Sequence, residues 1–446
     1  MDFWIRAAQL MLSLAILITL HEFGHYIAAR IFKIRVEKFY LFFDPWFSLF
    51  KKKIGQTEWG VGWLPLGGYV KIAGMIDESM DKEQMAQPPK EDEFRSKPAW
   101  QRLIVMIGGV TVNVILGFFI YIVVIAAWGE TVLENDKLKY GLAVHPSLKA
   151  EYPDLEDGMI ITAIDGQPLE NVNLINIKVF FRGARSLTVQ LTDGTEKEVV
   201  LYENIDDFMW ENDAIMAFTP RVPTYIDSLS EGRSIVNSGL QKGDQIISIN
   251  GKQTEYFHLL QHSLSQLEGD SALVSIGYLR NEDTLTADVW AKESDGVYTL
   301  GFFNRSPDFL VPTTKNYSFG KSIKKGIQKA GWTMHDYAAQ LPLFFTSKGA
   351  QSMGGFGAIG SLFPTTWDWE RFWLNTAFIS LILAIMNILP IPALDGGHIV
   401  FLLYEMITGK EAPQKVLEIA QVVGFVLLLG LLIFANGNDI YRAFFK

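Results

Sequence analysis

The sequence contains no cysteine among its 446 residues. Disulfide bonds and thiolate metal ligands are therefore excluded, and cysteine usage says nothing about the redox compartment. Positive charge is also scarce: the chain has 39 Lys and Arg residues but 49 Asp and Glu residues, which gives a net charge of -10. Binding to nucleic acid requires basic surface to neutralise phosphates, so we expect no nucleic-acid partner.

Four long apolar runs stand out from a chain in which hydrophobic residues make up 49%. Each is long enough to cross a bilayer. We expect transmembrane helices at about 7–29, 101–128, 372–389 and 416–435. The first run is too long for the apolar core of a signal peptide, so we expect it to be retained. The pattern predicts a polytopic α-helical membrane protein with a large insert between the second and third helices.

Lysine and arginine near the ends of the first two spans indicate the orientation. These residues are Arg30, Lys33, Arg35, Lys38, Arg95, Lys97 and Arg102. Cytoplasmic loops carry the excess of basic residues. We therefore expect the segment between these two spans to be cytoplasmic, and both termini and the insert to lie on the opposite side.

The first apolar run contains an H-E-x-x-H motif at residues 21–25. Positions i and i+4 share one face of a helix, so His21 and His25 can hold one metal ion. Glu22 lies beside them, placed to take a proton from water as in zinc metalloproteases. Chance occurrence and a core histidine are the alternatives, but ionisable groups inside a membrane are costly and usually functional. The motif predicts a catalytic metal site.

The third apolar run ends in NILPIPALDGGH, residues 387–398. Two prolines cannot continue a helix, so the backbone must open here, which at membrane depth requires a cavity. Asp395 would complete a site of two histidines and one carboxylate, which leaves the fourth position open for catalysis. The alternative is a plain helix-capping aspartate. We do not expect His398, nearly one turn beyond Asp395, to be a ligand.

Two segments lie between the first and second spans. Residues 36–72 are rich in aromatic and β-branched residues and contain turn signals, so we expect a membrane-associated β-sheet, with a small soluble hairpin as the alternative. Residues 76–97 are acidic and polar and are typical of a flexible linker. In the second span, Asn113 is a candidate for a hydrogen bond to another helix or to substrate. Together these elements form a first membrane half, 1–128.

The insert contains an internal repeat. LEDGMIITAIDG at 155–166 is echoed by LQKGDQIISING at 240–251. A domain-sized period indicates two copies of one fold, and the pattern resembles PDZ domains, α/β modules that bind an extended peptide at a sheet edge. We place the copies at 129–221 and 222–306. His258 and His262 repeat the i, i+4 spacing without an acid between them, so we do not expect a metal site there.

The remaining segments follow the second copy. Residues 307–370 form a linker with a basic amphipathic helix, in which Phe319, Ile323 and Ile327 recur at helical spacing. Such a helix can lie on the membrane surface, and a solvated helix packed on the second repeat is the alternative. Residues 371–446 form the second membrane half, with the segment containing Leu-Asp-Gly at 390–407 between the last two spans.

These motifs together resemble the site-2 protease family of intramembrane zinc metalloproteases, and within it the RseP-like bacterial members with tandem PDZ domains. The motifs are H-E-x-x-H at 21–25, LGGYV at 66–70, N-x-x-P-x-P-x-L-D-G at 387–396 and the PDZ-like repeats. The resemblance implies one Zn²⁺ held by His21, His25 and Asp395, with Glu22 as the base. It also implies that Asn387 contacts the substrate backbone, and we assign Asn113 to the same path.

The resemblance further implies a multi-pass protein of the bacterial inner membrane. Its partners would be the lipid bilayer and single-span regulatory proteins, such as anti-sigma factors already shortened by another protease. The oligomeric state stays open. This chain departs from the family in two places, with FFDPW at 42–46 in place of a Gly-x-Gly loop and GVTVN at 109–113 in place of G-P-x-x-N. Both changes concern how the substrate is held.

The competing class is a protein that is not an enzyme. A PDZ-type membrane scaffold with a structural metal, or a metal transporter, would share the spans and the metal ligands. Neither would need a base beside an open ligand position. Glu22 therefore discriminates between the two classes.

Overall fold

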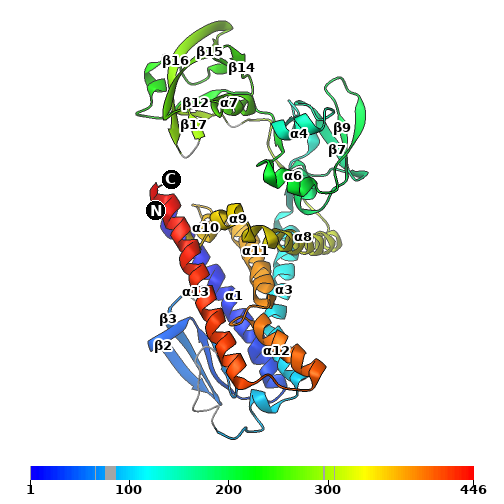
Figure 1. Cartoon of the computed structure of the whole chain (residues 1–446), viewed down its shortest axis with the longest axis vertical. Helices are drawn as coiled ribbons and strands as arrows, with labels where there is room; N and C mark the ends of the chain where they lie inside the picture. Colours follow the sequence, from blue (N-terminus) through cyan, green and yellow to red (C-terminus); the bar gives the residue numbers. More distant parts are fainter. Residues whose placement is uncertain (1, 66, 76–86, 295–296, 306, 446) are drawn as a thin grey trace. The chain divides into compact units, whose positions relative to one another are not determined.

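The computed structural model describes residues 2–65, 67–75, 87–294, 297–305 and 307–445. The chain forms two compact units (Figure 1). The membrane unit consists of Met1–Gly129 and Asn316–Phe445, and the insert unit consists of Glu130–Lys315. The insert thus interrupts the membrane unit between its second and third long helices, as the sequence predicts.

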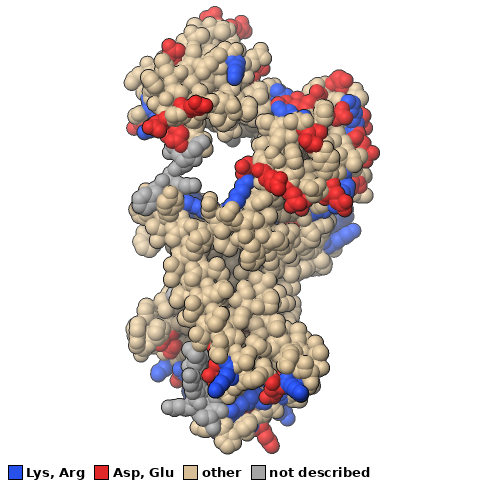
Figure 2. Space-filling model, viewed as in Figure 1, with Lys and Arg blue, Asp and Glu red and all other residues tan. Residues whose placement is uncertain are grey.

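Four helices in the described part of the chain are long and apolar enough to cross a membrane. They are α1 (Asp2–Ile31), α3 (Ala99–Trp128), α11 (Trp369–Ile388) and α13 (Gln414–Phe445). Most extend beyond the expected spans, because backbone hydrogen bonding continues through flanking polar residues that hydropathy does not count. On the face drawn in Figure 2, charged side chains are sparse over the middle of this unit and gather at its end near the sheet, as expected for a bilayer-spanning body.

Small residues bring α1 and α3 into backbone contact. A Cβ atom on Gly24 would lie 2.3 Å from the Gly108 carbonyl oxygen, and one on Gly108 would lie 2.6 Å from the Gly24 carbonyl oxygen. Farther along α3, a Cβ atom on Gly117 would lie 2.5 Å from the Leu381 side chain of α11. Such close packing is typical of helices in membranes. It places the metal-site motif of α1 directly against α3.

The remaining helices of this unit are shorter. They are α8 (Phe319–Gln340), α9 (Ser347–Ser352), α10 (Phe356–Ser361) and α12 (Asp395–Thr408), with 3₁₀ turns at Phe94–Ser96 and Leu341–Phe345. Helix α8 is the expected amphipathic helix, and within the membrane unit it packs against α3 and α11. Its buried residues are small, and a Cβ atom on Gly326 would lie 2.6 Å from the Ile122 backbone. Phe319 and Ile327 are exposed, and the position of α8 on a membrane surface stays a prediction.

A four-stranded sheet follows α1 in the order β2-β3-β1-β4. Its strands are β1 (Val36–Leu41), β2 (Phe43–Ile54), β3 (Thr57–Leu64) and β4 (Tyr69–Ile72). Strand β1 runs parallel to β3 and antiparallel to β4. Phe39 of β1 packs edge-on against Phe23 and Tyr26 of α1, so the sheet is attached to the helix that carries the motif. The structure contains the expected sheet, and its association with the membrane stays a prediction.

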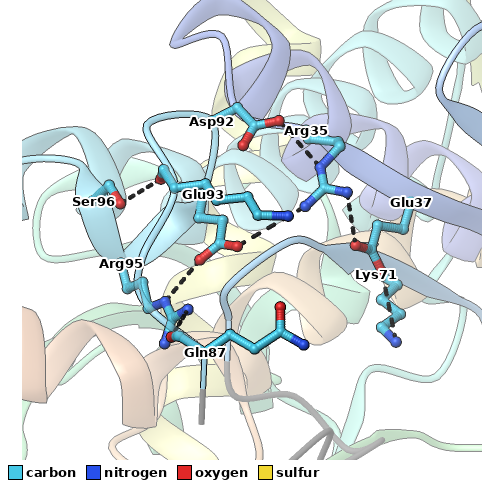
Figure 3. Close-up of polar contacts among 9 residues, drawn as sticks. Arg35, Glu37, Lys71, Gln87, Asp92, Glu93, Arg95 and Ser96 are labelled. Carbon is cyan, nitrogen blue, oxygen red and sulfur yellow. Dashed lines mark hydrogen bonds and ion pairs between the residues drawn. The ribbon is translucent and has the colours of Figure 1, made fainter. Parts of the chain in front are cut away.

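Part of the expected linker, 76–86, lies outside the described residues. The described remainder is anchored to the sheet by ion pairs (Figure 3). Arg35 lies 3.2 Å from Asp92 and 3.4 Å from Glu37, and Arg95 lies 2.8 Å from Glu93. Composition gives no sign of this anchoring, because each partner is an ordinary surface residue until the fold brings them together.

The first copy in the insert unit contains strands and three short helices. The strands are β5 (Glu130–Val132), β6 (Leu142–Val144), β7 (Ile160–Ile164), β8 (Gln167–Pro168), β9 (Ser186–Gln190), β10 (Glu196–Val200) and β11 (Phe218–Pro220). The helices are α4 (Pro146–Glu151), α5 (Ile175–Phe181) and α6 (Ile205–Glu211), with 3₁₀ turns at Asn135–Lys137 and Val172–Leu174. The main sheet has the order β10-β9-β7-β8.

The second copy repeats this plan with a longer sheet in the order β14-β13-β15-β16-β17. Its elements are β12 (Ile226–Leu229), β13 (Gln245–Ile249), β14 (Lys252–Gln253), β15 (Ser271–Arg280), β16 (Asp283–Ser294), β17 (Val297–Thr299), β18 (Phe302–Asn304), α7 (Phe257–Leu264) and a 3₁₀ turn at Ser234–Asn237. Strand β19 (Thr313–Lys315) then returns to pair with β5.

The two repeat segments fold into the same hairpin. β7 with β8 and β13 with β14 occupy matching positions of the repeat. Both hairpins turn on a polar residue and a glycine with positive φ, Asp165 (50°) with Gly166 (69°) and Asn250 (47°) with Gly251 (77°). Asp-Gly and Asn-Gly are the pairs that tolerate this turn. Sequence spacing and local backbone geometry therefore agree.

Candidate metal centre

Helix α1 places both motif histidines on one face. The His21 and His25 rings lie edge to face, and their Nε2 atoms are 3.2 Å apart. Two ring nitrogens at this distance cannot both direct hydrogen atoms at each other, whereas two lone pairs can converge on one cation. The helical spacing alone produces this pairing.

Asp395 reaches the histidines because α11 ends before the two prolines and the chain reverses. The turn requires glycine, since a Cβ atom on Gly396 would lie 2.0 Å from the Leu389 carbonyl oxygen. Leu394 occupies the N-cap position of α12 and makes no side-chain capping bond. The Asp395 carboxylate instead lies 3.3 Å from the Nε2 atoms of both His21 and His25. This position disfavours the plain capping role.

The three ligand atoms form a near-equilateral triangle with sides of 3.2, 3.3 and 3.3 Å. A tetrahedral zinc ion with bonds of about 2.0–2.1 Å places its ligand atoms roughly 3.3–3.4 Å apart. Asp395 Oδ2 is buried and has no hydrogen-bond partner, which is costly unless a cation neutralises it. The donor set and its spacing therefore fit one zinc ion with a fourth position open.

Neighbouring groups orient each imidazole. His25 Nδ1 lies 2.8 Å from the Val105 carbonyl oxygen, so Nδ1 carries the hydrogen and Nε2 is free to bind metal. The Asn113 amide nitrogen lies 3.2 Å from His21 Nδ1, and the Asn113 amide oxygen is buried without a hydrogen-bond partner, so exchanging the two amide atoms satisfies the oxygen. With that oxygen turned toward the ring, Asn113 accepts a hydrogen bond from His21 and both histidines have the same tautomer. Both supports come from α3.

Gly109 forms the wall behind the histidines. A Cβ atom at this position would lie 2.4 Å from His25 Nε2 and 2.8 Å from His21 Nε2. Sequence reasoning does not connect Gly109 or Val105 with the metal site. The only available signal was the GVTVN segment, whose place matches G-P-x-x-N in the resembling family.

Glu22 lies next to the triad but outside the triangle of ligand atoms, as a base requires. The segment before β4 passes close to it, because a Cβ atom on Gly68 would lie 3.7 Å from Glu22 Cγ. Glu22 is therefore close both to the ligand histidines of its own helix and to the segment that leads into β4.

The remaining residues considered from the sequence are two asparagines and three further histidines. Asn387 lies at the end of α11 with its amide nitrogen 3.5 Å from His21 Nε2, and the substrate-contact roles of Asn387 and Asn113 stay predictions. The triad of His21, His25 and Asp395 is the only such cluster among the described residues, so it includes neither His398 nor the pair on α7. His258 of that pair instead contacts Asp157 at 3.3 Å.

Comparison with known proteins gives the same assignment over nearly the whole chain. The model of Peptidase family M50 matches residues 9–431. The Regulator of sigma E protease of Haemophilus influenzae is 27% identical, over 99% of this chain and 100% of its own length. Protease RseP of Yersinia pestis is 25% identical over 98% of both chains. A Vibrio cholerae protein described as a candidate zinc metalloprotease is 27% identical over 97% of both. The chain therefore belongs to Peptidase family M50.

Proposed function

We propose that this metalloprotease hydrolyses peptide bonds inside the membrane-spanning segments of single-span proteins. The observation that carries the proposal is the ligand triangle of His21, His25 and Asp395, contributed by a membrane-crossing helix and by the turn after another. A protease for soluble substrates would not need its metal site within membrane-spanning helices. Ionisable groups in membrane helices usually mark such a function.

The chain's own residues divide the chemistry between them. When bound, zinc supplies a Lewis acid that polarises the scissile carbonyl and makes water a stronger acid. Glu22 accepts the proton of the attacking water and returns it to the leaving amine. Val105 and Asn113 hold the imidazoles in the tautomer that the ligands need. Helix α3 packs directly on the two histidines through Gly109.

A substrate helix must unwind before its peptide groups are accessible. The edge strand β4 offers backbone groups with which an extended segment can pair, since β4 has a partner strand, β1, on one side only among the described strands.

An alanine-to-glycine change in the substrate span should raise the cleavage rate about fivefold, because glycine weakens the substrate helix by about 1 kcal/mol and so favours unwinding. The rate is measured with a purified single-span substrate, and an alanine-to-leucine change is the control. Equal rates for all three substrates would refute unwinding as a required step.

We further propose that the two PDZ-like copies filter substrates and admit proteins that another protease has already trimmed. The sigma-E name of one relative suggests anti-sigma-factor-like substrates, and the family resemblance suggests regulated intramembrane proteolysis at the bacterial inner membrane. The basic residues around the first two spans support an orientation with both copies and both termini on the extracytoplasmic side.

Deletion of residues 129–306 tests the filter. If the copies exclude bulky substrates, the deletion variant should cleave untrimmed single-span proteins that the full chain leaves intact. Cleavage of trimmed and untrimmed forms is compared on gels, with zinc content as the control for an intact membrane unit. Weaker cleavage of every substrate would instead mean that the copies capture a carboxy terminus, and an unchanged preference would rule out both roles.

A further inference from the structure

Residues 42–46 form an irregular loop that comprises Phe42 and the bulged start of β2, and this loop has an unusual backbone for the residues that it contains. Phe42 and Trp46 both have positive φ, 66° and 72°. Bulky side chains rarely adopt this conformation, and it persists only where the surroundings enforce it. The loop is enforced at close range, because the Trp63 indole N–H donates to the Pro45 carbonyl oxygen at 2.9 Å. A loop with a fixed backbone also fixes the positions of the residues that its side chains contact.

Asp44 connects this loop to the edge strand. Its carboxylate accepts a hydrogen bond from the Tyr69 hydroxyl at 2.9 Å and another from the Ser48 hydroxyl at 2.9 Å. Phe43 stacks on the Tyr69 ring at 6.0 Å and 8°. Both described contacts of Asp44 are thus with hydroxyl groups, which give a carboxylate two partners without a buried cation.

Tyr69 is the first residue of β4, the strand at the edge of the sheet. Its ring also stacks on Tyr40 of β1 at 5.3 Å. Gly68, the residue before it, is the point where the chain passes Glu22 and Ile18 of α1. A hydrogen bond at Tyr69 therefore fixes the end of β4 that lies nearest the general base.

The other end of β4 is fixed separately. Lys71 lies 3.6 Å from Glu37, and Glu37 belongs to the ion-pair network that anchors the linker (Figure 3). The Ala73 N–H donates to the Arg35 carbonyl oxygen at 2.9 Å. Pairing with β1 aligns Tyr69 with Tyr40, and the Asp44–Tyr69 bond adds a side-chain hydrogen bond that fixes the end of β4 near the active site.

We propose that Asp44 is a positioning residue for substrate recognition, holding β4 in the register at which an extended segment pairs beside Glu22. The inference rests on the proposed function and deepens it. Asp44 acts through Tyr69 and contacts neither the metal ligands nor Glu22 in the described contacts. Its loss should therefore weaken substrate binding and leave the chemical step and the metal unchanged.

The test uses the full chain in detergent and a designed single-span protein as probe. Asp44→Ala should raise KM about tenfold and leave kcat within about twofold, because one hydrogen bond to a charged group is lost. Tyr69→Phe, which keeps the ring and loses the donor, should do the same, and the double variant should be no worse than either. Asp44→Asn is the matched control, because its amide oxygen still accepts from Tyr69. A Glu22→Gln background gives the same comparison as a probe Kd without turnover.

The outcomes separate this inference from the proposed function. If the wild type cleaves the probe and Asp44→Ala keeps the wild-type KM, the role of Asp44 is refuted and the protease assignment stands. A fall in kcat or in zinc content for both Asp44→Ala and Tyr69→Phe would show a merely structural role and also refute it. If the wild type neither binds nor cleaves any single-span probe, the proposed function fails and this inference fails with it.

Discussion

Glu22→Gln is expected to abolish peptide-bond cleavage while one zinc ion stays bound per chain. The amide keeps the size and shape of the side chain but cannot accept a proton from water. General-base catalysis contributes roughly 10²- to 10⁴-fold, so a loss of at least a hundredfold is expected. The ligand atoms on His21, His25 and Asp395 are untouched, so metal analysis should show zinc at the wild-type level. Cleavage of a single-span substrate and zinc content are measured on the same preparations.

Glu370→Gln is a suitable control, because Glu370 lies in the first turn of α11 and is not among the metal ligands. It makes the same chemical change in a membrane helix and should leave cleavage unaffected. Substantial cleavage by Glu22→Gln would remove the base from the mechanism. A scaffold or transporter with a structural metal would then be the better description of the geometry.

Gly109→Ala is expected to lose zinc and, with it, activity. The added methyl group would lie 2.4 Å from His25 Nε2 and 2.8 Å from His21 Nε2, the two nitrogen atoms proposed to bind the metal. Neither ring can move away and keep its ligand geometry, because His25 is held by Val105 on the same helix as Gly109. A displacement of several tenths of an ångström exceeds the tolerance of a metal site. Zinc per chain, measured by elemental analysis, should fall well below one.

The matched control is Gly430→Ala in α13, where an added methyl group meets nothing within 4 Å. The same change in another membrane helix should leave zinc and cleavage at wild-type levels. If Gly109→Ala binds zinc normally and cleaves substrate, then α3 does not confine the histidine rings and the description of the site wall is wrong.

The candidate ligands could be picked from the sequence because each is energetically costly at its position. Two histidines and a glutamate in an apolar run cannot be explained by packing, and Asp395 follows two prolines that must open a helix. The residues that orient and confine the candidate ligands have no such unusual feature in the sequence. Val105 contributes only its backbone oxygen, Gly109 contributes the absence of a side chain, and the Asp44–Tyr69 bond joins residues that are ordinary on their own.

By itself, the sequence determined the pattern of long apolar runs, the repeat in the insert and the candidate metal ligands. Those properties follow from local chemistry, namely the length of apolar runs, hairpin turn residues and helical spacing. Only the tertiary structure decided that the ligand atoms form a triangle of zinc dimensions, that α3 orients both imidazoles, and that β4 is tied to Asp44 beside the base. These features depend on contacts between residues that are far apart in the chain. Hydropathy, secondary-structure propensity and motif spacing report only on residues that are close in sequence, so they cannot predict such contacts.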